Sequence, residues 1–384
     1  MRSVVVLGAG MVGSVIADDL ARQGGYRVTV IDRDEARLDS LRRRIGSKVI
    51  VQRADLASPA GVREVVAPHD LVIGALSSTL GYRVLEAVIE AGRNCCDISF
   101  MPERALDLDE RARRAGVTAV VDCGVAPGLS HMMAGAGVAA LDQARSVEIY
   151  VGGLPVVRQW PFEYKAAFAP RDVIEEYTRP SRLVVRGRVV EKPALSECEL
   201  IDIPGVGTLE AFNTDGLRTL VETLVVPDMK EKTLRYPGHV ELMRVFREAG
   251  FLSSEPVEVE GVRVRPVDLF SALVFPSWSY APGEEDLTVM RVVVRGTRDG
   301  RRVTLSWDLL DRYDPRREQT SMARTTAFPC AIVARLIDEG RVGQRGVIPP
   351  ERLGGDSALF RHVLAELGER GVGCRYEERV EESP

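Results

Sequence analysis

The stretch "VVVLGAGMVGSVIADDLARQG", residues 4–24, decides the fold of the first part of the chain. Its opening apolar run predicts a buried parallel strand, and Gly8, Gly10 and Gly13 follow with the spacing GxGxxG. The apolar pattern then becomes helical, and a second β-branched run ends at Asp32. A strand, a glycine turn, a helix and a later acid in this order predict a Rossmann unit, whereas a glycine turn alone would be weak support.

Each residue type in this pattern has a physical reason. The first glycine permits a tight turn, the second lets the backbone approach a pyrophosphate, and the third lets the helix pack on the strand. The helix N-terminus holds phosphate charge, and Asp32 accepts hydrogen bonds from ribose hydroxyls, which favours NAD. Arg33 would suit a 2′-phosphate, so NADP is the alternative. The residues expected to bind the dinucleotide here are Gly8, Ala9, Gly10, Met11, Val12, Gly13, Asp32 and Arg33.

The alternation of strands and helices continues, with strands expected over 49–51, 70–76, 95–99 and 117–124. In a doubly wound parallel sheet, ligands lie outside the carboxyl ends of the strands. Further cofactor contacts are therefore expected at Asp55, Ala75, Leu76, Ser77, Asp97 and Ser99.

The segment "GVAPG", residues 124–128, is a cluster of small residues directly after the sixth strand. A flat nicotinamide ring pressed against the backbone would leave no room for side chains, so Val125, Ala126, Pro127 and Gly128 are expected to contact the ring. The alternative is that the segment is a hinge between domains.

A different pattern begins near residue 145 and predicts an α+β domain with a mainly antiparallel sheet, which would bind substrate and form a homodimer. The expected domains are a Rossmann domain over 1–125 and the α+β domain over 126–320, with a helix over 321–340 that returns to the first domain and a segment over 341–384 near the junction. In the second domain, the expected elements are a strand entering a glycine turn (146–155), a hairpin (182–193), two long strands joined at Asp299-Gly300 (287–313) and helices (238–250 and 266–275).

The segment "WPFEYKAAF", residues 160–168, places Glu163, Tyr164 and Lys165 among aromatic residues. A half-buried lysine can act as a base or as a hydrogen-bond donor, although a lysine lying over aromatic rings at the surface would give the same pattern. Glu163 and Lys165 are candidate catalytic residues and Tyr164 a candidate substrate contact.

Two further stretches carry polar groups that suit a substrate site. "LEAFNTDGLRTL", residues 209–220, contains Arg218, whose planar guanidinium could clamp a substrate carboxylate. His239 is expected at a helix N-terminus, where a neutral imidazole suits a base but also a simple cap. Helix caps would also explain part of the stretch 209–220. The candidate substrate contacts in that stretch are Asn213, Thr214, Asp215 and Arg218.

Composition excludes several classes of function. The 384 residues have a net charge of −5 with both signs interspersed, so no basic stripe points to nucleic acid. Six scattered cysteines form no zinc-type spacing and suit a reducing cytoplasm, and no metal site is expected. Without a long uninterrupted apolar run, no membrane span is expected.

Together these motifs resemble the saccharopine dehydrogenase family, and within it the lysine 6-dehydrogenase branch. The resemblance rests on "VLGAGMVG", "GVAPG", "YVGGLP", "LEAFNTDGLRTL", "TLRYPGH", "MARTTAF" and "RGVIPPE", which occur in this order over nearly the whole chain. It implies hydride transfer between nicotinamide and a carbon that bears an amine or imine. The resemblance distinguishes two branches at residues 126–128. Saccharopine reductases are expected to carry "DPG" there, whereas lysine 6-dehydrogenases are expected to carry "APG", as this chain does.

The resemblance therefore implies oxidation of the ε-amine of L-lysine to the semialdehyde with NAD. One alternative is a saccharopine or carboxynorspermidine dehydrogenase that performs a reductive condensation with NADPH. The serines and Gly81 in "SSTLGY", residues 77–82, and "SFMP", residues 99–102, depart from the pattern of the branch. An alternative of another class is a regulatory protein that binds NAD without catalysis.

Overall fold

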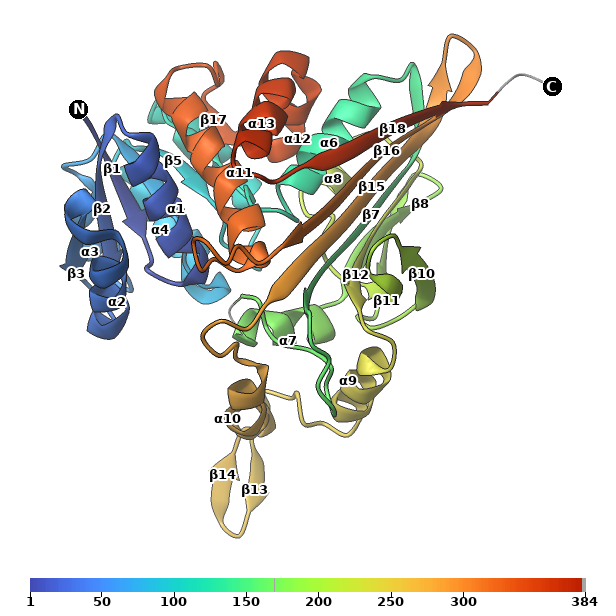
Figure 1. Cartoon of the computed structure of the whole chain (residues 1–384), viewed down its shortest axis with the longest axis horizontal. Helices are drawn as coiled ribbons and strands as arrows, with labels where there is room; N and C mark the ends of the chain where they lie inside the picture. The colour runs from blue at the N-terminus through green and yellow to red at the C-terminus, as the bar shows by residue number, and fades with distance from the viewer. Residues whose placement is uncertain (169, 382–384) are drawn as a thin grey trace. The chain divides into compact units, whose positions relative to one another are not determined.

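The chain divides into two compact units, which the computed structural model describes for residues 1–168 and 170–381. The first unit comprises Met1–Ala139 and Ala323–Gly373, and the second comprises Ala140–Met322 and Cys374–Pro384 (Figure 1). The first unit thus runs past the expected boundary at residue 125, and the C-terminal stretch is shared between the two units. None of the helices among the described residues combines the length and hydropathy that crossing a membrane requires.

The first unit contains a seven-stranded sheet in which every pair of neighbours is parallel. Its order, β17-β6-β5-β4-β1-β2-β3, reverses direction beside β1, as in a doubly wound Rossmann sheet. The predicted α/β fold is confirmed, whereas β17 was not expected. The strands are β1 (Arg2–Leu7), β2 (Tyr26–Asp32), β3 (Val49–Arg53), β4 (Leu71–Gly74), β5 (Asn94–Asp97), β6 (Thr118–Val120) and β17 (Gly346–Ile348).

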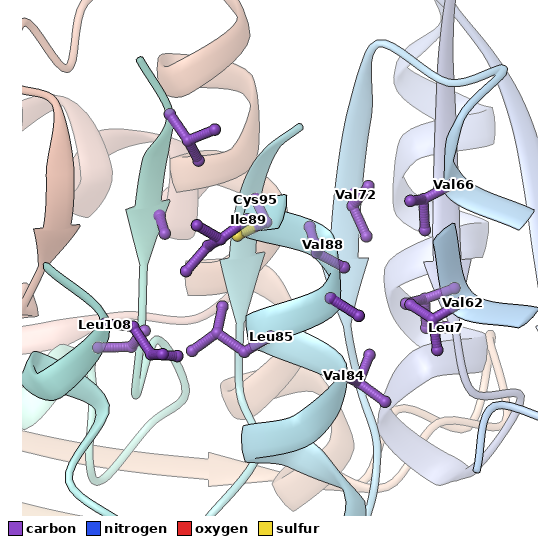
Figure 2. Packing of buried hydrophobic residues seen from close by; sticks show 14 of the residues in the cluster. Leu7, Val62, Val66, Val72, Val84, Leu85, Val88, Ile89, Cys95 and Leu108 are labelled. Atoms are coloured by element: carbon purple, nitrogen blue, oxygen red, sulfur yellow. The ribbon is translucent and has the colours of Figure 1, made fainter. Parts of the chain in front are cut away.

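Valine-rich helices cover this sheet. Figure 2 shows Val62 and Val66 of α3 and Val84 and Val88 of α4 packed toward the strand residue Val72. Burying each such side chain contributes about 1.5–3 kcal/mol, which fixes the helices on the sheet and therefore the loops at its carboxyl edge. The helices of this unit are α1 (Met11–Gln23), α2 (Glu35–Ile45), α3 (Pro59–Val66), α4 (Ser78–Glu90), α5 (Asp109–Arg114), α6 (Leu129–Ala139), α12 (Pro350–Gly355) and α13 (Ser357–Glu369), with short 3₁₀ turns η1 (Gly46–Lys48) and η2 (Ala105–Leu108).

Close packing of α6 on α12 explains why the first unit continues to Ala139. A Cβ atom at Gly135 would lie 2.1 Å from Glu351 O, and one at Gly354 would lie 1.9 Å from Met132 O. The helix α11 (Ser321–Asp338) begins in the second unit and runs through the first.

The second unit contains a nine-stranded sheet that is antiparallel except for the pair β12–β7. Figure 1 shows β7, β15, β16 and β18 running side by side along it. The hairpins around 186–187 and 299–300 are confirmed. The strands are β7 (Gln143–Pro155), β8 (Ser181–Val185), β9 (Arg188–Lys192), β10 (Glu199–Ile203), β11 (Gly207–Asn213), β12 (Asp228–Arg235), β15 (Asp286–Arg298), β16 (Arg301–Arg312) and β18 (Cys374–Val380).

The expected glycine turn at the end of 146–155 is wrong, because Gly152 and Gly153 lie inside β7. A Cβ atom at Gly152 would lie 2.6 Å from Leu234 O, and one at Gly153 would lie 2.5 Å from Met322 Cε. These glycines permit close packing within the second unit and make no turn.

Aromatic packing around Trp278 organises the helical side of the second unit. The ring of Trp278 is fully buried, and the rings of Tyr164, Tyr177 and Phe270 lie within 5.2–6.4 Å of it, centroid to centroid. This cluster ties the segment near 164 to the helices. The remaining elements are α7 (Pro170–Thr178), α8 (Leu220–Thr223), α9 (His239–Glu248), α10 (Pro266–Trp278) and a separate hairpin of β13 (Val257–Val259) and β14 (Val262–Val264).

Candidate functional site

The glycine turn after β1 is shaped by close backbone contacts. Gly8 has a φ of 111°, and a Cβ atom there would lie 2.3 Å from Ala75 O. A Cβ atom at Gly13 would lie 2.1 Å from Gly8 O, so α1 can approach β1 only with glycine at that position. At Gly10 a Cβ atom would meet no described atom within 4 Å, so this side of the turn is open.

The open side of the turn fits a dinucleotide pyrophosphate. Gly10 is the N-cap of α1, and because it has no side chain it leaves the first N–H groups of the helix without a side-chain cap. These N–H groups and the positive end of the helix dipole suit an anion. Ala9, Met11 and Val12 supply the remaining backbone of the turn, as expected from the motif.

Asp32 ends β2 and is joined to the same turn. Its Oδ2 accepts a hydrogen bond from Ala9 N at 2.7 Å, and its Oδ1 accepts one from Asp34 N at 2.9 Å. Each carboxylate oxygen can accept two hydrogen bonds, so each retains one acceptor position for a ribose hydroxyl. The carboxylate therefore fixes the turn and presents an acceptor at the end of the strand.

A groove of about 670 Å³ lies at the ends of β2 and β3. Arg53 Nε donates to Arg33 O at 3.1 Å, which places two arginines along it. Asp55 Oδ1 accepts from the backbone N of Ala57 at 3.0 Å and so orders the loop after β3. The groove thus offers guanidinium groups that suit a phosphate close to the carboxylate of Asp32. It is lined by Arg33, Asp34, Arg53, Ala54 and Asp55.

The segment 75–77 continues this edge of the sheet. Ala75 N donates to Leu7 O at 2.9 Å, which ties the end of β4 to the end of β1. Leu76 is partly buried, and Ser77 is the N-cap of α4, with its Oγ 3.1 Å from Thr79 Oγ1. The segment lies at the carboxyl edge where the sequence analysis expects a cofactor contact.

Asp97 and Ser99 form a buried polar pair at the end of β5. The Ser99 backbone N donates to Asp97 Oδ1 at 2.7 Å. Burial raises the pKa of Asp97 to about 7, and the nearby Asp122 carboxylate acts in the same direction. Cys123 N donates to Asp97 O at 2.9 Å, so the pair lies beside the chain that leads into the loop 124–128.

The loop 124–128 is closed by its own backbone. Gly124 N donates to Pro127 O at 3.0 Å, and a Cβ atom at Gly128 would lie 2.0 Å from Gly124 O. Gly128 N donates to His131 Nδ1 at 3.1 Å, a role for His131 that the sequence analysis missed. Closure of the loop therefore requires glycine at position 128, where φ is also 134°. Val125 is buried, whereas Ala126 and Pro127 are partly exposed, so these two are the loop residues that could contact a ring.

In the second unit, the candidate catalytic residues Glu163 and Lys165 are both ion-paired. Lys165 is buried, and its Nζ lies 2.5 Å from Glu284 Oε2. The lysine lowers the pKa of Glu284 through this hydrogen bond. Glu163 pairs with Arg158. Lys165 therefore donates a hydrogen bond to Glu284.

The third candidate base, His239, is buried at the start of α9 with both ring nitrogens engaged. Nδ1 lies 2.8 Å from Phe162 O, and Nε2 lies 2.8 Å from Tyr177 Oη. A carbonyl only accepts, so Nδ1 carries the proton and Nε2 accepts from the tyrosine. Burial, and secondarily the charge of Arg235, lower the pKa of His239 to about 3. The imidazole is thus neutral and holds Tyr177 and the segment near 162 together.

Tyr164 belongs to a buried polar cluster that sequence reasoning did not find. Its ring lies 4.9 Å from that of His239, and the guanidinium of Arg235 lies over it at 4.4 Å. Arg235 Nη2 pairs with Glu176 Oε2 at 2.8 Å, and its Nε donates to Tyr177 Oη at 3.3 Å. The signal for this cluster was the sequence of β12, DMKEKTLR, which is mostly polar although the strand lies inside the sheet between β11 and β7.

Other members of the predicted substrate group also have partners. Thr214 Oγ1 donates to Glu231 Oε2 at 2.6 Å, and burial raises the pKa of Glu231 to about 8. Asp215 Oδ1 accepts from Arg182 Nε at 3.0 Å.

Asn213 and Arg218 complete this group. Asn213 Nδ2 donates to Ser196 Oγ at 3.1 Å and to Glu197 Oε2 at 2.9 Å. Arg218 is buried and has a φ of 48°. The structure brings Tyr164 and His239 together, whereas Asn213, Thr214 and Asp215 each bond to a different segment. Their roles toward a substrate stay predictions.

Comparison with known proteins covers both units. Residues 4–120 match the saccharopine dehydrogenase NADP binding domain, and residues 124–372 match the saccharopine dehydrogenase C-terminal domain. The chain belongs to the saccharopine dehydrogenase family. Members of this family are oxidoreductases. The first unit of the chain matches their domain that binds the nicotinamide dinucleotide.

Individual members of the saccharopine dehydrogenase family match over nearly the full length. Saccharopine dehydrogenase [NADP(+), L-glutamate-forming] of Schizosaccharomyces pombe is 24% identical over 99% of both chains. Carboxynorspermidine synthase of Vibrio cholerae is 24% identical over 95% of both. The structure of apo saccharopine dehydrogenase from Saccharomyces cerevisiae superposes with a TM-score of 0.80 at 18% identity over 100% of both chains.

These matches confirm the predicted family and the predicted combination of a Rossmann unit with a second, mainly antiparallel sheet. They also confirm two further predictions. The cofactor is a nicotinamide dinucleotide, and the protein is an oxidoreductase that acts on amino-acid substrates. The lysine 6-dehydrogenase branch, the homodimer and the individual site residues stay predictions.

Proposed function

We propose that the protein oxidises the ε-amine of L-lysine to the semialdehyde with NAD. The observation that carries this proposal is Ala126, a small and partly exposed residue in the closed loop after β6. Saccharopine reductases resemble this chain but have an aspartate at that place, which contacts the amine of their larger substrate. With alanine, the loop offers no carboxylate to a secondary amine and suits a smaller primary amine.

In this proposal, different residues bind the different parts of the cofactor and the substrate. The N-terminus of α1 would hold the pyrophosphate, Asp32 the ribose hydroxyls, and Ala126 and Pro127 one face of the ring. The bound nicotinamide supplies the acceptor for a hydride from the substrate carbon. In the second unit, Arg218 is proposed to hold the substrate carboxylate.

The proposed catalytic side chains differ in what they can do. His239 is neutral, with both nitrogens engaged, so its contribution is to position Tyr177 and the segment around Phe162. Lys165 is paired with Glu284 and suits donation of a hydrogen bond to a substrate oxygen. Glu163 is paired with Arg158 at the edge of the same segment and is the only carboxylate of the three.

A second candidate is the reductive formation of a secondary amine with NADPH. It is favoured by Arg33 and Arg53, whose guanidinium groups line the groove at the adenosine end and suit a 2′-phosphate. Relatives named for such products, the V. cholerae carboxynorspermidine synthase and the Synechocystis carboxyaminopropylagmatine dehydrogenase, match almost the whole chain.

A screen of substrates against both cofactors separates these candidates. The purified protein is assayed with NAD and NADP against lysine, other amino acids, diamines and saccharopine, following the absorbance of the reduced nicotinamide. The proposal expects the highest kcat/KM with lysine and NAD. Faster oxidation of saccharopine with NADP would replace it by the second candidate, and no turnover with any amine would favour a regulatory NAD-binding protein.

A single substitution sharpens the screen. Ala126→Asp restores a carboxylate to the loop and is expected to lower kcat/KM for lysine at least tenfold. Ala60→Asp, the same change on the exposed surface of α3, is the matched control and is expected to leave activity unchanged. Equal activity of the two variants would show that residue 126 does not face the substrate.

A further inference from the structure

The hairpin of β13 and β14 has one face on which both strands carry valine. Its register pairs Val257 with Val264 and Val259 with Val262, and directly paired residues of an antiparallel hairpin point to the same side. Val257, Val259 and Val262 are between 48% and 62% exposed. Figure 1 shows the hairpin extending beyond α10, away from the large sheet of the second unit. Because a two-stranded hairpin is marginally stable in water by itself, this valine face requires a surface to pack against.

The helix α10, which follows the hairpin directly, is apolar on two opposite sides. One side carries Phe270, Val274 and Trp278, which are buried in the aromatic cluster of the second unit. The other side is an exposed stripe with the helical spacing i, i+3, i+4, i+7, formed by Leu269, Ala272, Leu273 and Pro276. A helix at the surface of a protein normally carries polar residues on its outer side. The second apolar stripe therefore indicates that α10 is covered on both sides.

The exposed stripe also lies in a segment without charge. No charged residue occurs between Asp268 and Glu284, although 28% of all residues in the chain are charged. A charged partner surface would lose its water here and find no opposite charge in return. The stripe therefore suits a partner surface that is itself apolar and uncharged, and the same stripe on a second copy of the chain is such a surface.

The first unit does not offer a matching surface. All of its residues are described, and its exposed large hydrophobic side chains are Met1, Met11 and Ile50, which lie at the N-terminus, on α1 and on β3. In the second unit, five such side chains fall between Val257 and Leu273 alone. The apolar surface that complements the hairpin and α10 is thus the same surface on another copy, rather than the first unit of the same chain.

We infer that α10 and the hairpin contact the same elements of a second copy of this chain across a two-fold axis. Ala272 lies in the middle of the stripe, and its small side chain lets two copies of α10 approach closely, with Leu269 and Leu273 packed beside it. A two-fold contact uses one surface on both copies, so the stripe and the valine face need no second kind of partner. The hairpin and α10 span residues 257–278, which is of the order of the 20–30 residues that each side of a standard interface uses.

The contact supports the segment that carries the candidate substrate residues. The backbone O of Trp278, at the end of α10, accepts a hydrogen bond from Ala166 N at 2.8 Å, and the ring of Trp278 packs on that of Tyr164. Covering the outer side of α10 therefore holds in place the helix that makes these contacts. The inference is independent of which amine the protein oxidises.

The mass of the protein in solution tests the contact. Sedimentation equilibrium compares the unmodified protein with Leu269→Glu combined with Leu273→Glu, which places two charges in the stripe. The unmodified protein should have twice the mass of this variant at the same concentration. Val189→Glu combined with Leu200→Glu, which changes similarly exposed residues on β9 and β10, is the matched control and should keep the mass of the unmodified protein. Equal masses of the unmodified protein and the variant in the stripe would overturn the inference.

A covalent link tests the two-fold geometry without introducing charge. Cys198, an exposed thiol, is first replaced by serine. In that background, Ala272→Cys should form a disulfide between two copies under mild oxidation, because the axis brings the two residues together. Ala60→Cys, on the exposed surface of α3, is the control and should form no such link. If Ala272→Cys gives no intermolecular disulfide, the two-fold contact is wrong, and the stripe is covered by the first unit or by a different protein.

Discussion

The turn after β1 and the polar face of β12 meet the same requirement, a charged or polar group held in place, in opposite ways. At the turn, backbone groups hold the charged residue in place. Gly13 packs against Gly8 O, and Asp32 accepts hydrogen bonds from backbone N–H groups. At β12, side chains from distant segments hold one another, as Arg235 holds Glu176 and Tyr177. The first region leaves positions open for a ligand, whereas the second neutralises its charges within the protein.

The difference predicts how each region responds to substitution. A substitution at the turn should weaken ligand binding more than it lowers the stability of the fold, unless the new side chain would clash with the backbone. Loss of a side chain from the cluster around Arg235 should affect folding directly, because it leaves a buried partner uncompensated. The substitutions below test this contrast.

The largest effect is expected from Arg235→Leu. Removing the guanidinium leaves Glu176 without its cation, and breaking a buried ion pair in this way costs about 3–5 kcal/mol. Chemical denaturation should show this loss in the free energy of unfolding. Arg63→Leu, which breaks an exposed pair with Glu90, is the control and should cost no more than about 1 kcal/mol. Similar losses in the two variants would contradict the assignment of Arg235 to a buried structural cluster.

Gly13→Ala and Gly10→Ala form a matched pair within the turn. The new methyl group at residue 13 would clash with Gly8 O. We therefore expect the free energy of unfolding to fall by about 1–3 kcal/mol, with a lower Tm, and dinucleotide binding to weaken. At residue 10 it meets no described atom, and the φ of −70° suits alanine, so the Tm should not change. Binding should nevertheless weaken about tenfold or more, because the methyl group would stand where the pyrophosphate approaches. Fluorescence titration with reduced dinucleotide measures the affinity, and a Gly10→Ala variant that binds normally would remove the pyrophosphate assignment.

Glu231→Gln tests the buried acid on β12 through pH. The pKa of Glu231 is raised to about 8 in the folded protein, so the folded state binds this proton more tightly than the unfolded state. The resulting stability is fully present below the ordinary pKa of a glutamate and is lost as pH rises through about 8. Between about pH 5 and pH 9 the unmodified protein should therefore lose on the order of 1–3 kcal/mol more than Glu231→Gln. Glu64→Gln, at an exposed position, should follow the unmodified protein, and parallel curves for all three proteins would contradict a buried, protonated Glu231.

The smallest effects concern the choice of cofactor. Asp32→Ala removes a carboxylate that would repel a 2′-phosphate and should lower the ratio of NAD to NADP efficiency about tenfold. Arg33→Ala removes a guanidinium from the groove and should raise the same ratio. Steady-state kinetics with both cofactors measures the two ratios. A shift in the same direction for both variants would mean that loop disorder, and not charge, dominates.

The same contrast explains what the sequence could predict. The glycine motif, Asp32 and the alternation of strands and helices in the first unit could be predicted, because they belong to one supersecondary unit whose residues occur at fixed spacing. The pairing of Arg235 with Glu176, and of Thr214 with Glu231, joins segments far apart in sequence, and no local pattern specifies it. The loop 124–128 lies between these cases: its small residues were evident, but the hydrogen bond to His131 that closes it was not.

Transfer of deuterium tests the central claim most directly. Lysine deuterated at the carbon that bears its side-chain amine is incubated with the protein and NAD, and the reduced nicotinamide is analysed by mass spectrometry and NMR. The account predicts that deuterium appears on the nicotinamide ring and that turnover slows relative to unlabelled lysine. A protein that binds the dinucleotide at the turn after β1, yet transfers no deuterium from lysine to it, would contradict the proposed oxidation.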